Sequence, residues 1–329
     1  MQVWCDKDKD MPRVIAITSG KGGVGKSNFT LNVGICLAMM EHRVQILDAD
    51  LGLANIDVLL DVRPRKTLED VVFNGVDSRE IVMKTDYRLE LIPGPSGTQD
   101  MADLPGEKIE ELVRSVMTIS KDAEFLLVDT ASGISSGVIS FLLAAPEVIV
   151  GVSPEPTSLT DAYALIKVLV KNGYHGRVSM FSSMVKTSAA GHTLYKKISS
   201  ASQRFLDAHV DYLGSVYLDE KLKKAVADQV PAVVRYPTSD ISRSYRVIAL
   251  TLLGQEVPAA DEEKLWSKLI AMLAKAQRPK AAKEAAPAGG DRNGSLESTL
   301  HDILSEQRKS RMLLEKLVEK VGRDTTTPR

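Results

Sequence analysis

A glycine-rich segment near the N-terminus carries the residue types that bind phosphate. It matches the pattern G-x-x-x-x-G-K-[ST] and consists of Gly20, Lys21, Gly22, Gly23, Val24, Gly25, Lys26 and Ser27. In such a loop, glycines let backbone N–H groups curl around phosphate oxygens, and the helix that follows directs its positive end at them. Lys26 would reach the β and γ oxygens, and the Ser27 hydroxyl would hold Mg²⁺. The sequence therefore predicts a phosphate-binding loop in preference to a flexible glycine turn.

Three acidic residues follow apolar runs at positions where a metal ion could be held. Asp48 and Asp50 follow the run VQIL, and Asp129 follows EFLLV. Asp129 closes its run as a Walker B acid does and could hold the hydration shell of Mg²⁺. Asp48 and Asp50 are two residues apart and so face the same side of an extended chain, where one could support the metal and the other a water molecule. The alternative is that these acids only cap strand ends for solubility.

Short apolar runs that recur along the chain would position these groups. The phosphate loop lies between a predicted strand, residues 13–19, and a predicted helix, residues 27–40. Continuous apolarity predicts strands that are covered on both faces, and helix-length segments separate most of them. The other predicted strands are 43–50, 88–94, 124–131, 147–153 and 177–184. The pattern predicts an α/β fold: a doubly wound, mainly parallel sheet with helices on both faces, plus a C-terminal helical extension.

The C-terminal region differs from the rest of the chain in amino-acid composition. Residues 264–283 contain six basic residues and no acidic one. On a helical wheel, Trp266 and its apolar neighbours share one broad face, opposite Lys264, Lys268, Lys275 and Arg278. A Trp-bearing apolar face opposite lysines is typical of a helix that lies on an anionic membrane surface. The alternative is an ordinary final helix packed on the domain.

The chain divides into six predicted segments. The last predicted helix, residues 296–322, has a heptad pattern of apolar residues that is interrupted. This pattern fits a weak coiled coil or a helix that docks on a partner, and it fits equally a lone solvated helix. The segments are a charged leader (1–11), a P-loop domain (12–256), the basic amphipathic helix (257–279), a flexible linker (280–295), the C-terminal helix (296–322) and a tail (323–329).

Composition excludes several classes of protein. The 329 residues carry a formal net charge of -1, which divides into -4 over residues 1–260 and +3 over residues 261–329. The net negative charge of residues 1–260 argues against a protein that binds nucleic acid over its surface. Two cysteines and five scattered histidines exclude a disulfide framework and a cysteine metal cluster, and they fit a reducing cytoplasm. We expect neither a signal peptide nor a membrane-spanning run.

Lys21 lies inside the phosphate loop, where most such loops have an arbitrary residue. The segment SGKGGVGKS resembles the deviant Walker A motif K-G-G-x-G-K-[ST] of the MinD and ParA ATPases. In that family the first lysine reaches the partner's nucleotide across an ATP sandwich dimer, much as an arginine finger does. The resemblance implies a homodimer that forms on ATP, hydrolysis of ATP to ADP and phosphate with Mg²⁺, and Lys21 and Asp50 as catalytic residues.

Other segments resemble the FlhG branch of this family, also called FleN, which regulates flagellar number and placement. The similarity covers residues 12–275 and includes DADLGLANIDVLLDV, LIPGPSGTQDMADL, LLVDTASGIS and SPEPTSLTDAYALIK. It implies partners such as an FlhF-like GTPase, a basal-body component or a flagellar transcription activator, and reversible membrane association through residues 264–278. A ParA-type partitioning ATPase and a division-site MinD remain the alternatives.

The resemblance also assigns roles to individual residues. Ser27, Asp48 and Asp129 are implied metal residues, and Asp50 would orient the attacking water. Where the family often has Asn before Met near the adenine, this chain has Ser183 before Met184. The implied nucleotide contacts are Gly20, Lys21, Gly22, Gly23, Val24, Gly25, Lys26, Ser27, Asn28 and Ser183.

Overall fold

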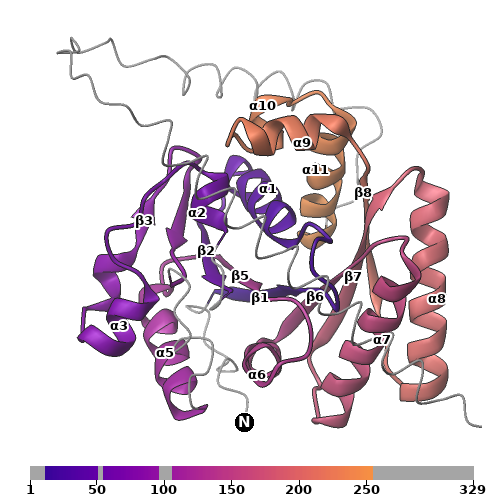
Figure 1. The fold of residues 1–329 in the computed structure, drawn as a ribbon, viewed down its shortest axis with the longest axis horizontal. Helices are drawn as coiled ribbons and strands as arrows, with labels where there is room; N and C mark the ends of the chain where they lie inside the picture. Colours follow the sequence, from indigo (N-terminus) through magenta and orange to yellow (C-terminus); the bar gives the residue numbers. More distant parts are fainter. Residues whose placement is uncertain (1–11, 51–54, 96–105, 255–329) are drawn as a thin grey trace, which may run out of the picture. The chain divides into compact units, whose positions relative to one another are not determined.

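The computed structural model describes residues 12–50, 55–95 and 106–254, without the side chains of 106–111 and 113. Within these residues, eight strands form one sheet in the order β3-β4-β2-β5-β1-β6-β7-β8 (Figure 1). The strands are β1 (Arg13–Thr18), β2 (Val44–Ala49), β3 (Met83–Lys84), β4 (Leu89–Ile92), β5 (Phe125–Thr130), β6 (Glu147–Val152), β7 (Arg177–Val185) and β8 (Asp211–Tyr217).

The strand pairing confirms the predicted α/β fold. Every neighbouring pair is parallel except β3 with β4, which is antiparallel. All six predicted strands are present, with bounds that shift by at most two residues. The two further strands, β3 and β8, lie at the edges of the sheet. β8 lacks a continuous apolar run because only Leu213 and Val216 within it are buried, which is why the sequence pattern did not reveal it.

Helices cover both faces of the sheet. One face carries α1 (Lys26–Met39), α2 (Ile56–Leu59), α9 (Glu220–Ala227), α10 (Ala232–Arg235) and α11 (Asp240–Leu252). The other carries α3 (Leu68–Asn74), α5 (Gly106–Ile119), α6 (Ser136–Ala144), α7 (Pro156–Lys171) and α8 (Ser188–Leu206), with the short 3₁₀ helix η1 (Ser78–Ile81) beside them. Within β1, Val14 and Ala16 pack on the second face and Ile15 and Ile17 on the first. A central strand buried on both faces is what its continuous apolarity predicted.

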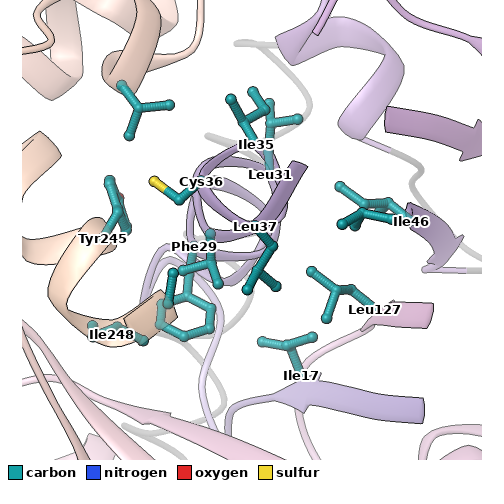
Figure 2. Packing of buried hydrophobic residues seen from close by; sticks show 14 of the residues in the cluster. Ile17, Phe29, Leu31, Ile35, Cys36, Leu37, Ile46, Leu127, Tyr245 and Ile248 are labelled. Atoms are coloured by element: carbon teal, nitrogen blue, oxygen red, sulfur yellow. The ribbon is translucent and has the colours of Figure 1, made fainter. Parts of the chain in front are cut away.

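Helix α1 lies between the sheet and α11, and this packing fixes the helix that follows the phosphate loop. Figure 2 shows Ile17, Ile46 and Leu127 of the sheet on one side of α1, and Tyr245 and Ile248 of α11 on the other. Phe29 stacks on Phe181 of β7 with ring centroids 3.8 Å apart. Because α1 is apolar on nearly all sides, it is held rigidly, and so is the loop at its N-terminus.

The predicted C-terminal segments lie outside the described residues. These are the basic amphipathic helix (257–279), the linker (280–295), the C-terminal helix (296–322) and the tail (323–329), together with the leader (1–11). Among the helices that the structure describes, none is long and apolar enough to cross a membrane.

Candidate nucleotide-phosphate site

The phosphate loop joins the carboxyl end of β1 to the N-terminus of α1, as the motif requires. Gly25 has φ +92° and forms the N-cap of α1, a backbone conformation that a side chain would strain. At the start of the loop, Gly20 lies against α7: a Cβ on Gly20 would come within 2.3 Å of the backbone of Asp161. Glycine at these two positions lets the loop turn tightly and pass directly over α7.

The N-terminus of α1 is arranged to accept an anion. It has no side-chain cap on its first backbone N–H groups and no acidic residue in its first turn. The N-terminus of a helix carries a partial positive charge and N–H groups without intrahelical partners. Gly22, Gly23 and Val24 precede this end in the loop, and Val24 is buried. Together the loop and the helix end form a site for phosphate oxygens.

Lys26 lies inside this site. Its side chain is buried, and Nζ donates a hydrogen bond to Ser132 Oγ at 2.6 Å. Burial lowers the pKa of Lys26, although the carboxylates of Asp129, Asp50 and Asp48 oppose the shift. A phosphate oxygen at the helix end would act in the same direction as these carboxylates and hold the lysine charged.

Asp48 and Asp129 lie side by side at the ends of β2 and β5, where they are register partners. Each is only 1% exposed. Burial and then the charge of Asp129 raise the pKa of Asp48 to about 7, although its carboxylate accepts backbone N–H groups of Asn55 and Ile56 at 2.9 and 3.0 Å. Burial likewise raises the pKa of Asp129 to about 6. Two buried neighbouring carboxylates favour a cation between them and the phosphate loop.

The oxygen donors at this position fit Mg²⁺. The Asp129 carboxylate accepts hydrogen bonds from the hydroxyls of Ser27 and Thr30, the latter at 3.2 Å, so the hydroxyl and the acid predicted to hold the metal are adjacent. In the described part of the chain, no three His, Cys, Asp or Glu side chains gather closely enough to hold an ion alone. Mg²⁺ is commonly bound by one or two carboxylates together with substrate phosphates and water, so the ion would arrive with the nucleotide.

Asp50 belongs to the same group of charges. Its backbone N–H donates to Asp48 Oδ1 at 3.2 Å, which fixes the chain where it leaves β2. Its carboxylate is close enough to Lys26 and Asp129 to influence the pKa of each. The structure therefore brings together Lys26, Ser27, Asp48, Asp50 and Asp129.

Lys21 is directed elsewhere. Its Nζ forms an ion pair with Glu155 and lies 3.3 Å from Thr157 Oγ1 at the N-terminus of α7. The Lys21 side chain is 41% exposed, in contrast to the buried Lys26. The two lysines of the loop thus occupy different surroundings.

The two remaining predicted contacts lie on β7 and on α1. Ser183, on β7, donates a hydrogen bond to the Val24 carbonyl at 2.7 Å. Asn28, in the first turns of α1, accepts a hydrogen bond at its carbonyl from Asn32, whose side chain also accepts the N–H of Val233 at the start of α10.

Sequence reasoning did not single out three residues that contact the loop lysines. Ser132 bonds to Lys26 across 106 sequence positions, and Glu155 and Thr157 contact Lys21 across 134 and 136. No spacing rule joins such distant residues. The segments LLVDTASGIS and SPEPTSLTDAYALIK, which contain them, were noticed only through family resemblance.

A doubly wound parallel sheet with a glycine loop, a buried lysine and two acids at adjoining strand ends defines a P-loop NTPase. Residues 10–253 match the ParA family profile, described as "NUBPL iron-transfer P-loop NTPase". The chain belongs to the ParA/MinD family of P-loop NTPases.

Several relatives cover most of the chain. The chain is 39% identical over 247 residues to the antiactivator FleN of Pseudomonas aeruginosa, an alignment that covers 75% of this chain and 88% of FleN. It is 30% identical over 274 residues to the flagellum site-determining protein YlxH of Helicobacter pylori, covering 81% and 92%. Among solved structures, the MinC:MinD cell division protein complex of Aquifex aeolicus matches with a TM-score of 0.62 and 26% identity over 75% of this chain and 98% of that chain.

Proposed function

We propose that this chain is an ATP-hydrolysing switch that closes into a dimer on ATP and regulates flagellar number or placement. The observation that supports an ATP-dependent dimer is that the two lysines of the phosphate loop have different surroundings. Lys26 is buried beside Ser132 and the acids, whereas Lys21 is exposed and pairs with Glu155. A lysine of the phosphate loop whose side chain is 41% exposed is able to reach the nucleotide of a second subunit.

The residues around the loop have distinct tasks in this proposal. The N-terminus of α1, Lys26 and Ser27 bind and orient the phosphates of ATP. Ser27, Asp48 and Asp129 hold Mg²⁺, which when bound neutralises charge on the phosphate oxygens. Asp50 orients the attacking water, and Lys21 of the second subunit stabilises charge on the transferred phosphoryl group. The transition state of phosphoryl transfer is loose, so positioning and electrostatics supply most of the catalysis.

The cellular role is proposed from the relatives. Two proteins that align with most of this chain carry names that refer to a flagellar antiactivator and to flagellum site determination. We therefore propose partners of the kinds inferred from the sequence: an FlhF-like GTPase, a basal-body component or a flagellar transcription activator. Deletion of the gene followed by counting flagella per cell tests this part, and an unchanged number and position would contradict it.

We propose reversible association with anionic membrane through residues 264–278, which lie outside the described residues. Two weak membrane helices in one dimer bind more strongly than one, so binding should require ATP. Flotation on anionic liposomes, with a chain truncated at Asp261 as comparison, tests this. Equal flotation of the two proteins would contradict it.

Other functions are less well supported by the chain. Partitioning of DNA needs a basic surface, and residues 1–260 carry a net charge of -4. Iron transfer, named in the description of the matching family, commonly relies on cysteine ligands. The chain has only Cys5 and Cys36, and Cys36 is buried in α1.

Light scattering tests the dimer. Asp50→Ala keeps the phosphate loop and the metal acids but removes the residue proposed to orient water. With Mg²⁺ and ATP we expect it to accumulate as a dimer, and with ADP as a monomer. Lys26→Ala, which weakens phosphate binding, is the control that should remain monomeric with either nucleotide. A monomeric Asp50→Ala protein in saturating ATP would contradict the proposal.

A further inference from the structure

Charge is distributed unevenly over the folded part of the chain. Residues 162–206 contain seven basic residues and no acidic one, although residues 1–260 as a whole carry a net charge of -4. This acid-free stretch runs from within α7, through β7, to the end of α8. The two helices pack against each other on one face of the sheet, and Figure 1 shows them side by side. Their basic residues therefore belong to one layer of the fold.

Both helices direct basic side chains away from the sheet. On α7, Lys167 and Lys171 are one turn apart and exposed, whereas the opposite side of the helix is buried. On α8, the exposed side carries Lys196, Lys197 and Arg204, and its opposite side is again buried. We call these five residues the α7–α8 basic face.

The charge of the α7–α8 basic face is not neutralised by neighbouring acids. Among the residues that the structure describes, none of the five side chains takes part in an ion pair. The acids that follow the stretch have other partners: Asp207 accepts a hydrogen bond from Gln203 at 2.9 Å, and Asp211 pairs with Arg177 at 2.8 Å. A cluster of unpaired positive charges on an outward surface attracts an anionic partner.

A large apolar side chain lies at the end of the same face. Phe205, the penultimate residue of α8, is 66% exposed, more than any other large hydrophobic side chain of the described residues. The guanidinium carbon of Arg204 lies 5.2 Å from the centroid of its ring. An exposed aromatic ring beside lysines and arginine is the combination with which peripheral proteins contact a bilayer, because the ring enters the headgroup region while the cations bind the anionic lipids.

We propose that the α7–α8 basic face and Phe205 form a second membrane-contact surface, on the folded domain itself, that binds anionic lipid headgroups. The proposal deepens the membrane association proposed above and rests on it for the choice of a lipid surface. A bilayer touches only the outward face of the two helices. A long nucleic acid would also run past the rest of the domain, which is correspondingly more acidic and repels it.

Flotation of the full chain with Mg²⁺ and ATP, on vesicles of phosphatidylglycerol mixed with phosphatidylcholine, tests the charge. The test variant leaves residues 264–278 unchanged and combines three substitutions on α8: Lys196→Gln, Lys197→Gln and Arg204→Gln. Each basic residue near an anionic leaflet contributes about fivefold to binding, so the affinity of this variant for the vesicles should fall by at least about tenfold.

The matched control removes the same number of charges from α9. It combines Lys221→Gln, Lys223→Gln and Lys224→Gln, all at exposed positions. These lysines lie next to acids, and Lys223 pairs with Glu220 at 2.8 Å. The control should therefore bind the vesicles as tightly as the unmodified protein.

A second pair of variants tests the ring. Phe205→Ser should weaken vesicle binding by about fivefold, because the ring no longer enters the headgroup region. Phe73→Ser, at the end of α3, is the control. Phe73 is 51% exposed and lies outside the α7–α8 basic face, so its loss should leave vesicle binding unchanged.

Several results would overturn the inference. Equal flotation of the α8 variant and the unmodified protein would do so and would leave membrane binding through residues 264–278 intact. An equal loss in the α9 control would do so too, because any lost positive charge would then have the same effect. Binding of duplex DNA that the α8 variant loses, with unchanged flotation, would assign the face to nucleic acid instead. If the unmodified protein does not float at all, the proposed membrane association is itself contradicted.

Discussion

Removing the charge of Asp129 should stabilise the protein while it abolishes hydrolysis. Asp129 is 1% exposed and lies beside Asp48, so without a metal ion its negative charge is unfavourable in the folded state. In Asp129→Asn the amide oxygen can still accept the hydrogen bond that the Thr30 hydroxyl donates. The substitution therefore removes a charge and changes little else in the packing.

The size of the stabilisation by Asp129→Asn, and its dependence on pH, follow from the pKa of Asp129. Burial raises it from 3.8 to about 6. The folded protein thus binds a proton more readily than the unfolded chain, and the unmodified protein loses stability as pH rises from about 4 to about 6. Each pKa unit corresponds to about 1.4 kcal/mol, which gives on the order of 2–3 kcal/mol at pH 7. Asp129→Asn has no carboxyl group at this position and does not lose this stability. The difference in the free energy of unfolding between Asp129→Asn and the unmodified protein should therefore be absent near pH 4 and complete above pH 6.

Urea denaturation in EDTA without nucleotide, repeated between pH 4 and pH 8, measures this advantage. Asp122→Asn, an exposed acid just before β5, is the control and should show no such dependence. Hydrolysis assayed with Mg²⁺ and ATP should be lost in Asp129→Asn. If the variant is less stable than the unmodified protein at pH 7, or if its advantage does not change with pH, the reasoning about the buried acids is wrong.

Three further substitutions have expected outcomes. Gly20→Ala places a Cβ 2.3 Å from the backbone of Asp161 and should lower the free energy of unfolding by about 1–3 kcal/mol in urea denaturation. Gly22→Ala is the control and should leave the free energy of unfolding unchanged, because its Cβ would have no atom nearer than 3.9 Å. Glu155→Gln releases Lys21 from an exposed ion pair and should strengthen ATP-dependent dimerisation by at most about fivefold in light scattering, since exposed pairs contribute about 0–1 kcal/mol; weaker dimerisation would contradict the role given to the pair. Asn32→Ala leaves the buried N–H of Val233 without its acceptor and should cost about 1–3 kcal/mol, in contrast to the exposed Asn172→Ala.

The sequence predicted those features that local pattern determines. The apolar runs of β1, β2 and β5 are continuous because both faces of these strands are buried, so their positions and parallel pairing could be inferred. The phosphate loop was found because its glycines and Lys26 must have fixed spacing. Asp48 and Asp129 were found because acids at the carboxyl ends of neighbouring parallel strands meet at one edge of the sheet.

Features that depend on contacts between distant segments could not be inferred. The pairing of Lys21 with Glu155 joins β1's loop to the start of α7, and no periodicity connects them. The direction of the Ser183 hydroxyl depends on how Val24 packs against β6 and β7. The edge strand β8 has too few buried residues to produce a pattern of its own.

The central claim is that Lys21 acts on the nucleotide of the other subunit, and mixing two inactive variants tests it most directly. Lys21→Ala retains Asp50, and Asp50→Ala retains Lys21. In a mixed dimer, the site of the Lys21→Ala subunit keeps its own Asp50 and receives Lys21 from the Asp50→Ala subunit. This site should therefore hydrolyse ATP again. Equal mixing of two proteins in a two-fold dimer makes about half of the dimers mixed, each with one working site, so ATP hydrolysis should rise to about a quarter of the unmodified rate. Activity no higher than that of the separate variants would show that Lys21 does not act across the dimer.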